Sequence, residues 1–94
     1  VVVRVLGKDV AALVDTGAAV SLIGNTIHNW CQDRNISVRT TRTRLRLASD
    51  AVVPAGNAVR LSLTVDGRRV RQRFVYLPGL AAAMILGRDF IIRY

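Results

Sequence analysis

The chain has 94 residues, of which 51% are hydrophobic, so we expect one small domain, residues 1–94, with a single core. No run of about 18 apolar residues is present, which argues against a membrane-spanning helix and a membrane partner. The lone Cys31 excludes an internal disulfide, and the formal charge of +8 raises the question of an anionic partner.

The first quarter of the chain predicts a β-hairpin. Residues 1–6 are β-branched and apolar, residues 7–9 are typical of a turn, and residues 10–14 predict a second strand. This strand runs directly into residues 15–17, Asp-Thr-Gly, and a further apolar run follows over residues 18–23. The Asp-Thr-Gly segment is therefore expected at the end of a buried strand.

A short helix is predicted over residues 26–34, with Asn25 or Thr26 as its N-cap. On this helix His28 is expected at the surface. Together with Cys31 it makes a poor metal site, because zinc takes about four ligands. No metal and no cofactor are therefore expected.

The rest of the chain predicts strands separated by turns. Asp-Gly between two alternating segments is a strong hairpin signal. Many short strands in a small chain indicate a sandwich or a closed barrel, so the fold class is all-β or mostly β, with about seven strands and one or two short helices. The expected elements are strands at residues 42–47, 51–53, 59–65, 69–76 and 84–86, a hairpin tip at residues 48–50, and the start of a helix at residues 87–92.

Arginines are concentrated in two stretches, residues 39–46 and residues 68–73. Over residues 43–47 they alternate with apolar residues, as a half-buried strand requires. We therefore favour solvated strand faces over a surface for nucleic acid or an acidic partner. Aromatic residues make up only 5% of the chain, which leaves few for base stacking, so nucleic acid is not an expected partner.

Residues 13–18, Leu-Val-Asp-Thr-Gly-Ala, are the segment most informative about chemistry. Burying a carboxylate behind apolar residues costs free energy unless it is hydrogen-bonded or shares a proton. Gly17 lets the backbone approach closely, and Thr16 can bond to the backbone and hold the loop. The alternative is an ordinary turn closing a strand, but apolar runs on both sides favour a functional loop. A second apolar segment ending in glycine, residues 83–89, is expected to cross beneath the same loop.

Residues 13–18 resemble the signature of retroviral and retrotransposon aspartic proteases, the retropepsins. Residues 85–89, Ile-Leu-Gly-Arg-Asp, resemble the second signature of that family, and residues 74–78 resemble the strand leading into it. The likeness covers nearly the whole chain. The Gly-Arg-Asp form and the run into Phe90 look closer to gammaretroviral and long-terminal-repeat retrotransposon members than to lentiviral ones. The resemblance implies a small closed barrel-like acid protease fold, one half of a twofold homodimer.

The resemblance also implies an aspartic endopeptidase. Its chemistry needs two carboxylates, and Asp15 is the suitable one in this chain. Asp89 is an alternative second acid, but it matches a position that the family uses structurally. A symmetric pair of Asp15 side chains supplies the partner. One carboxyl then activates a water as general base while the protonated one donates to the peptide carbonyl, which gives a bell-shaped, acidic activity profile.

The resemblance also implies roles for residues of the loop and of the second signature, because they match positions of the family. Thr16 would brace the two loops across the twofold axis, Gly17 would present its carbonyl to the substrate, and Ala18 would pack beneath the loop. Arg88 resembles the structural arginine of the family and would tie the short helix to the loop. The structural positions of the second signature are Gly87, Arg88 and Asp89. Lentiviral relatives have a carboxylate where this chain has Ala19, so the partner of Arg88 is left open.

The hairpin tip at residues 48–51 matches the flap of the family, which closes over a peptide and excludes water. This tip contains no glycine, unlike that of many relatives. Pocket-lining positions carry small or aliphatic residues, which implies apolar side chains beside the cleaved bond, with plain core positions as the alternative. The expected substrate-binding residues are Leu13, Ala19, Leu22, Ser49, Asp50, Ala51, Ala83 and Ile85.

The expected substrate is the polyprotein of a retroelement, and the alternative is a catalytically weak retropepsin-like module for dimerisation or protein binding. The intact residues 15–17 favour the protease. Only 14 residues precede Asp15 and only five follow Asp89, so either the dimer rests on loops and flaps or native terminal segments are missing. The lone cysteine and the lack of a visible signal peptide predict action in the cytoplasm or a virus-like particle, not secretion.

Overall fold

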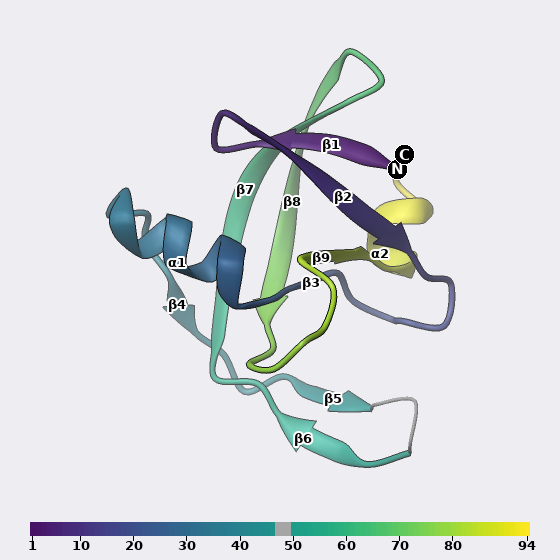
Figure 1. Ribbon diagram of the computed structural model, residues 1–94. Coiled ribbons are helices and arrows are strands. Elements are labelled where there is room, and N and C mark those ends of the chain that lie inside the picture. The colour runs from purple at the N-terminus through teal and green to yellow at the C-terminus, as the bar shows by residue number, and fades with distance from the viewer. Residues whose placement is uncertain (47–49) are drawn as a thin grey trace.

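The computed structural model describes residues 1–46 and 50–94, and its architecture is a small β-barrel with two short helices (Figure 1). The barrel strands are β1 (Val2–Val5), β2 (Lys8–Val14), β3 (Leu22–Ile23), β7 (Asn57–Val65), β8 (Arg68–Tyr76) and β9 (Met84–Leu86). The remaining elements are α1 (Asn25–Asp33), β4 (Arg39–Thr40), β5 (Arg44–Arg46), β6 (Val52–Pro54) and α2 (Arg88–Ile91). Within the described residues, six strands close a ring in the order β1-β2-β9-β3-β8-β7, because β7 also pairs with β1. The expected mostly-β closed barrel is confirmed.

Two hairpins of the barrel are built on two-residue turns. Leu6 and Gly7 have φ of 52° and 77°, and Asp66 and Gly67 have φ of 49° and 76°. Two successive residues with positive φ match the right-handed twist of the flanking strands, which is why such turns join tight hairpins. The predicted Asp-Gly hairpin is confirmed. The first turn was expected at residues 7–9, but it is one residue earlier, and β2 already begins at Lys8.

Helix α1 begins after Gly24, which has no side chain to cap it, so the expected cap at Asn25 or Thr26 is wrong. A Cβ at Gly24 would lie 2.8 Å from the carbonyl oxygen of Ala82, so the close approach of another loop selects glycine over a better capping residue. The helix packs Ile27 into the barrel core. In the described part of the chain, no helix is long and apolar enough to cross a membrane.

His28 is buried, with 8% of its surface exposed, so the expected surface position is wrong. Its ring stacks on Tyr76 at 3.8 Å between centroids and 4° between planes. The Tyr76 hydroxyl donates to Asn25 Oδ1 at 2.6 Å, which ties the start of α1 to the end of β8. Burial raises the pKa of the neighbouring Cys31 thiol, which therefore stays a neutral core side chain.

The pairing of β9 brings the two halves of the predicted site together. Strand β9 runs parallel to β2, with Val14 opposite Leu86, and antiparallel to β3, with Leu22 opposite Ile85. Strands β5 and β6 form a separate antiparallel hairpin beyond the barrel (Figure 1). The segments around residues 13–18 and 83–89 therefore meet, as the sequence predicts.

Candidate active site

The Asp15 carboxylate is fixed by its own loop. The Asp15 amide donates to the Leu86 carbonyl oxygen at 3.0 Å, which continues the β2–β9 pairing to the last residue before the loop. The Gly17 amide donates to Asp15 Oδ1 at 2.8 Å, and the Ala18 amide donates to the Asp15 carbonyl at 3.2 Å. A Cβ at Gly17 would lie 3.1 Å from the same carboxylate oxygen, so glycine leaves room for this bond. Asp15 itself is half-buried.

The first residue of α2 holds the far side of this loop. The Arg88 amide donates to the Ala18 carbonyl at 2.8 Å, and Arg88 Nη1 donates to the Thr16 carbonyl at 2.9 Å. The sequence left the partner of Arg88 open, because Ala19 carries no carboxylate. The structure places a backbone carbonyl of the Asp-Thr-Gly loop there. Such a bond to a charged donor is roughly twice as strong as a neutral one.

Gly87 lies where two backbone segments almost touch. A Cβ on this residue would lie 2.6 Å from the Val20 carbonyl oxygen and 2.7 Å from that of Ala18. Its amide donates to Ser21 Oγ at 3.0 Å. The chain after β9 can therefore lie against the loop after Asp15 only because residue 87 has no side chain.

Asp89 collects three hydrogen bonds behind the site. Ser21 Oγ donates to Asp89 Oδ1 at 2.7 Å, Gln72 Nε2 donates to Oδ2 at 2.9 Å, and the Phe90 amide donates to Oδ1 at 2.8 Å. Ser21 is fully buried and Gln72 is 1% exposed. The sequence analysis did not single out Gln72. The signal that could have found it was its position in β8, where it lies two residues from each of the apolar Val70 and Phe74 and so faces inward with them.

Replacing Asp89 by alanine is expected to lower the free energy of unfolding by about 3 kcal/mol, because two buried donors lose a charged acceptor. Urea unfolding of the purified chain measures this. Asp33→Ala is the matched control: Asp33 is exposed at the end of α1, and its loss should change stability by less than about 0.5 kcal/mol. Equal effects of the two substitutions would contradict the supporting role of Asp89.

A cavity of about 730 Å³ lies beside Asp15, between the loop and the β5–β6 hairpin. Of the residues expected at the site, it is lined by Asp15, Gly17, Ala18, Ala19, Leu22, Asp50, Ile85 and Arg88. Lining residues that the sequence analysis did not name are Val20, Arg44, Leu45, Arg46, Leu77 and Leu80. Leu45 is the buried residue of β5, where it lies between two exposed arginines. This alternation already indicated in the sequence that the Leu45 side chain faces inward.

Three expected substrate-binding residues lie outside this lining. Leu13 is 54% exposed on β2, Ala51 is exposed on the hairpin, and Ala83 packs against the main core. Ser49 lies outside the described residues. Thr16, the expected brace between two loops, is exposed at the tip of the Asp-Thr-Gly loop. Substrate and partner contacts of these residues stay predictions.

Large apolar side chains are exposed around the chain ends and the end of β2. Ile92 is 81% exposed after α2. The N-terminus lies against the second half of β2, where the Val1 ammonium donates to the Ala12 carbonyl oxygen at 2.9 Å, and the C-terminus directly follows α2 (Figure 1). Exposed apolar side chains mark interaction sites where they form a contiguous patch. The exposed residues concerned are Val1, Val2, Leu13, Val14, Ile92 and Tyr94.

The charges of the cavity are mixed. Arg46 and Asp50 form an ion pair at 3.7 Å on the hairpin, but both side chains are exposed, so the pair contributes little to stability. Within residues 1–46 and 50–94, no three His, Cys, Asp or Glu side chains are grouped as a metal site. Of the two carboxylates in this lining, Asp50 pairs with Arg46, and Asp15 is held by the Gly17 amide.

Comparison with known proteins identifies relatives of this chain. The sequence profile of a family described as gag-polyprotein putative aspartyl protease matches residues 1–93. A search of curated protein sequences finds no match. Solved structures also share the fold, among them three proteases or protease-like domains.

The retroviral protease-like domain of Ddi1 from Leishmania major superposes with a TM-score of 0.73 at 20% identity, over 99% of this chain and 74% of that one. EIAV protease in complex with the inhibitor HBY-793 gives a TM-score of 0.68 at 23% identity, over 99% of this chain and 84% of that one. The solution structure of simian foamy virus protease gives a TM-score of 0.64 at 14% identity, over 97% of this chain and 89% of that one.

Proposed function

Because this chain belongs to the family of gag-polyprotein putative aspartyl proteases, we propose that it is an aspartic endopeptidase that works as a homodimer on the polyprotein of a retroelement. The observation that carries the proposal is the position of Asp15. It directly follows strand β2, is held by the Gly17 amide, and lines a cavity large enough for part of an extended peptide.

The proposed mechanism needs a second carboxyl, which the second copy of Asp15 supplies. The other acidic residue of the cavity lining, Asp50, is exposed and paired with Arg46. Two carboxyls a few ångströms apart share one proton, and the aspartic protease dyad is the standard example of this behaviour. The ionised carboxyl takes a proton from water as the water attacks the peptide carbonyl. The protonated carboxyl donates to the carbonyl oxygen. No covalent intermediate with the enzyme forms.

Dimer formation is supported by the surface around the loop. Exposed Leu13 and Val14 precede Asp15 directly, and Ile92 follows α2, which itself holds the loop through Arg88. Burying these side chains against a second copy removes apolar area from water and brings the two Asp15 loops together. We place this dimer in the cytoplasm or in a virus-like particle as part of the same proposal.

The lining predicts the kind of peptide that is cut. Leu22, Leu77 and Ile85 offer aliphatic surface, so apolar side chains are expected beside the cleaved bond. The hairpin carrying Leu45 forms the roof of the cavity and is proposed to close over the peptide and exclude water.

The test is cleavage of an unfolded, apolar-rich polypeptide near pH 5, measured over a range of chain concentrations with the oligomeric state recorded in parallel. For a weak dimer the rate should rise more steeply than linearly with total chain and should become linear once the dimer is saturated. A rate that stays linear over concentrations at which the chain passes from monomer to dimer would contradict an active dimer.

Absence of cleavage at concentrations where the chain is dimeric would contradict the protease assignment. It would favour the alternative, a catalytically weak module for dimerisation or protein binding. Retention of the full Asp-Thr-Gly loop with its hydrogen bonds favours the protease over that alternative.

A further inference from the structure

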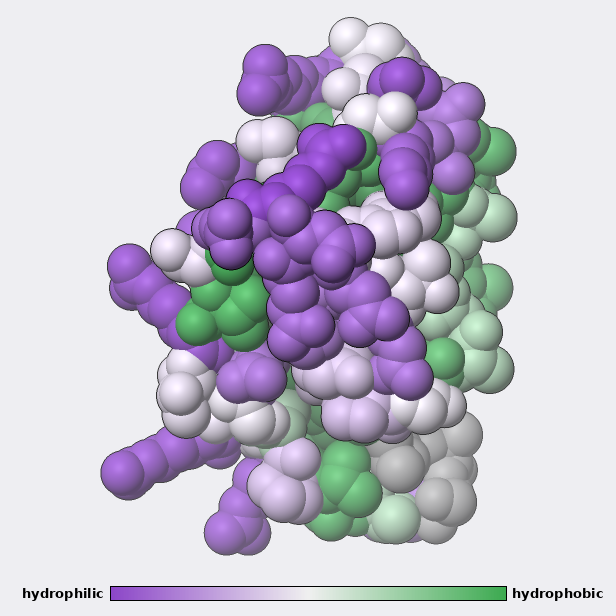
Figure 2. Space-filling view, turned by 60° about the vertical axis from the view of Figure 1, so that its left-hand side comes forward, coloured by the Kyte–Doolittle hydropathy of each residue, from purple (hydrophilic) through white to green (hydrophobic). Residues whose placement is uncertain are grey.

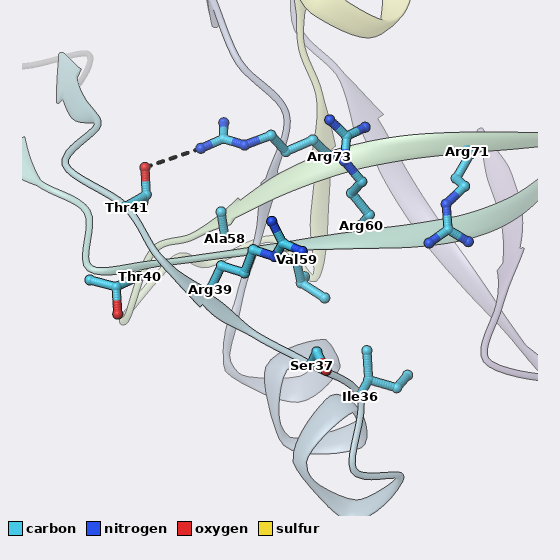
Figure 3. A pocket seen from close by; sticks show the side chains of 10 residues that line it. All are labelled: Ile36, Ser37, Arg39, Thr40, Thr41, Ala58, Val59, Arg60, Arg71 and Arg73. Atoms are coloured by element: carbon cyan, nitrogen blue, oxygen red, sulfur yellow. Dashed lines mark hydrogen bonds between the residues drawn. The ribbon is translucent and has the colours of Figure 1, made fainter.

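Two adjacent hollows of about 450 and 480 Å³ lie over the outer face of β7 and β8. Ile36, Arg60 and Arg71 line both, so the hollows form one continuous groove. Figure 3 shows one half of it, where arginines from β4, β7 and β8 extend toward the same space. We call this feature the basic groove, and its arginines are Arg4, Arg39, Arg60, Arg69, Arg71 and Arg73.

The positive charge of the basic groove is not balanced within the described chain. Arg4 pairs with Asp9 at 3.0 Å, while the other five arginines have no acidic partner among residues 1–46 and 50–94. Each hollow is lined by four arginines and, in that same part of the chain, by no acidic residue. In Figure 2, where the side carrying α1 and β4 is turned forward, hydrophilic side chains run across the middle of the molecule.

The register of the sheet concentrates this charge in a line. Arg69, Arg71 and Arg73 alternate along β8, so they recur about every 6.7 Å on one face. Arg60 of β7 lies directly opposite Arg73. Like charges in that position destabilise a sheet, and a bound anion would remove the cost. The Arg73 guanidinium is oriented by its bond to Thr41 Oγ1 at 3.1 Å (Figure 3).

The chemistry of the lining fits phosphodiester groups. Guanidinium forks bind phosphate oxygens in pairs, and hydroxyls of Thr41, Ser62 and Thr64 add donors of the kind that contact nucleic-acid backbones. No aromatic side chain in the described chain lines the groove, so base stacking does not contribute and binding should not depend on sequence.

An acidic peptide fits this groove less well. Extended peptides are commonly bound at free strand edges or in apolar pockets. Strand β8 lies between β7 and β3, so neither of its edges is free. The second edge of β7 pairs with β4 at residues 57–58 and with β1 at residues 63–64, which leaves residues 59–62 between them without a strand partner on that side. Because β4 and β1 close this gap at both ends, β7 offers no open edge along which an extended peptide strand could continue.

We propose that the basic groove binds nucleic acid through its phosphate backbone. The groove and the cavity at Asp15 share no lining residue, so this site is separate from the proposed protease site and does not depend on it. The sequence alone favoured solvated strand faces for these arginines. The structure changes that interpretation, because it gathers arginines from four strands into one groove.

The test is fluorescence anisotropy of an end-labelled oligouridylate with the Asp15→Asn chain, so that proteolysis plays no part. Arg60→Gln with Arg71→Gln removes the two arginines shared by both hollows. Affinity should fall at least about tenfold, and the slope of log K against log salt should shrink by roughly 1.4, or 0.7 per lost phosphate contact.

Arg42→Gln with Arg68→Gln is the matched control, since it removes the same charge from exposed arginines that line neither hollow. Its affinity should stay within about threefold of the parent chain. Thermal unfolding checks the folds, and the groove variant should melt no lower than the parent because the Arg60–Arg73 repulsion is gone. If it fails to fold, Arg60→Lys with Arg71→Lys replaces it, with weakened binding and an unchanged salt slope expected.

Three results would overturn the proposal. The first is no binding even at low salt. The second is equal loss in the groove and control variants, which would assign binding to net charge alone. The third is displacement of the oligouridylate by polyglutamate at equal charge concentration, which would make the partner an acidic protein.

Discussion

Replacing Asp15 by asparagine is expected to reduce cleavage roughly a thousandfold or more, because the proposed reaction loses both the base that activates water and the acid that protonates the carbonyl. Asparagine has nearly the same shape as aspartate and can still accept the hydrogen bond from the Gly17 amide. The fold should therefore persist. The cleavage rate, measured under one set of conditions near pH 5, reports the loss of activity. Circular dichroism spectra of the same samples report whether the fold persists.

Asp33→Asn is the control for this substitution, because Asp33 is exposed at the end of α1 and lies outside the cavity lining. Its cleavage rate should match that of the unchanged chain.

A mixing experiment adds a test of the shared site. When half of the chains in a saturated dimer are Asp15→Asn, about a quarter of the dimers keep two intact carboxyls, so the rate should fall to about a quarter. A fall to one half would indicate that each chain works alone.

Replacing Gly87 by alanine is expected to destabilise the fold by about 3 kcal/mol or more, because the new Cβ would lie within 2.8 Å of the Val20 and Ala18 carbonyl oxygens. Those atoms belong to the backbone and cannot turn away as a side chain would. For a domain of this size, a loss of about 3 kcal/mol corresponds to a melting temperature lower by roughly 12–24 °C. Differential scanning calorimetry measures it.

Gly56→Ala is the matched control for Gly87→Ala. A Cβ at Gly56 meets nothing within 4 Å, and its φ is not in the positive region. Its stability should change by less than about 0.5 kcal/mol or rise slightly, since alanine restricts the unfolded chain. A Gly87→Ala chain as stable as the control would show that the approach of the segment after β9 to the Asp15 loop is looser than the structure has it.

The sequence by itself determined the features that depend on neighbouring residues. Strand alternation located the strands, Asp66-Gly67 predicted the β7–β8 hairpin, and the apolar runs around residues 15–17 predicted a loop at a strand end. These signals are local, because a turn needs residues that tolerate positive φ and a half-buried strand needs a period of two. The two signature segments also indicated the fold class and the acidic residue of the site.

Only the tertiary structure decided the contacts between distant segments. The partner of Arg88 is a carbonyl 72 positions away in sequence, and Asp89 of α2 meets Ser21, which precedes β3, and Gln72 of β8. Gly24 stands at the N-cap instead of a residue with a capping side chain, because a Cβ there would lie 2.8 Å from the Ala82 carbonyl oxygen. Local helix preferences do not include this contact with a distant segment. The gathering of arginines from β1, β4, β7 and β8 into one groove likewise depends on ring closure. Such approaches are set by how the whole barrel packs, and no single segment of the chain encodes them.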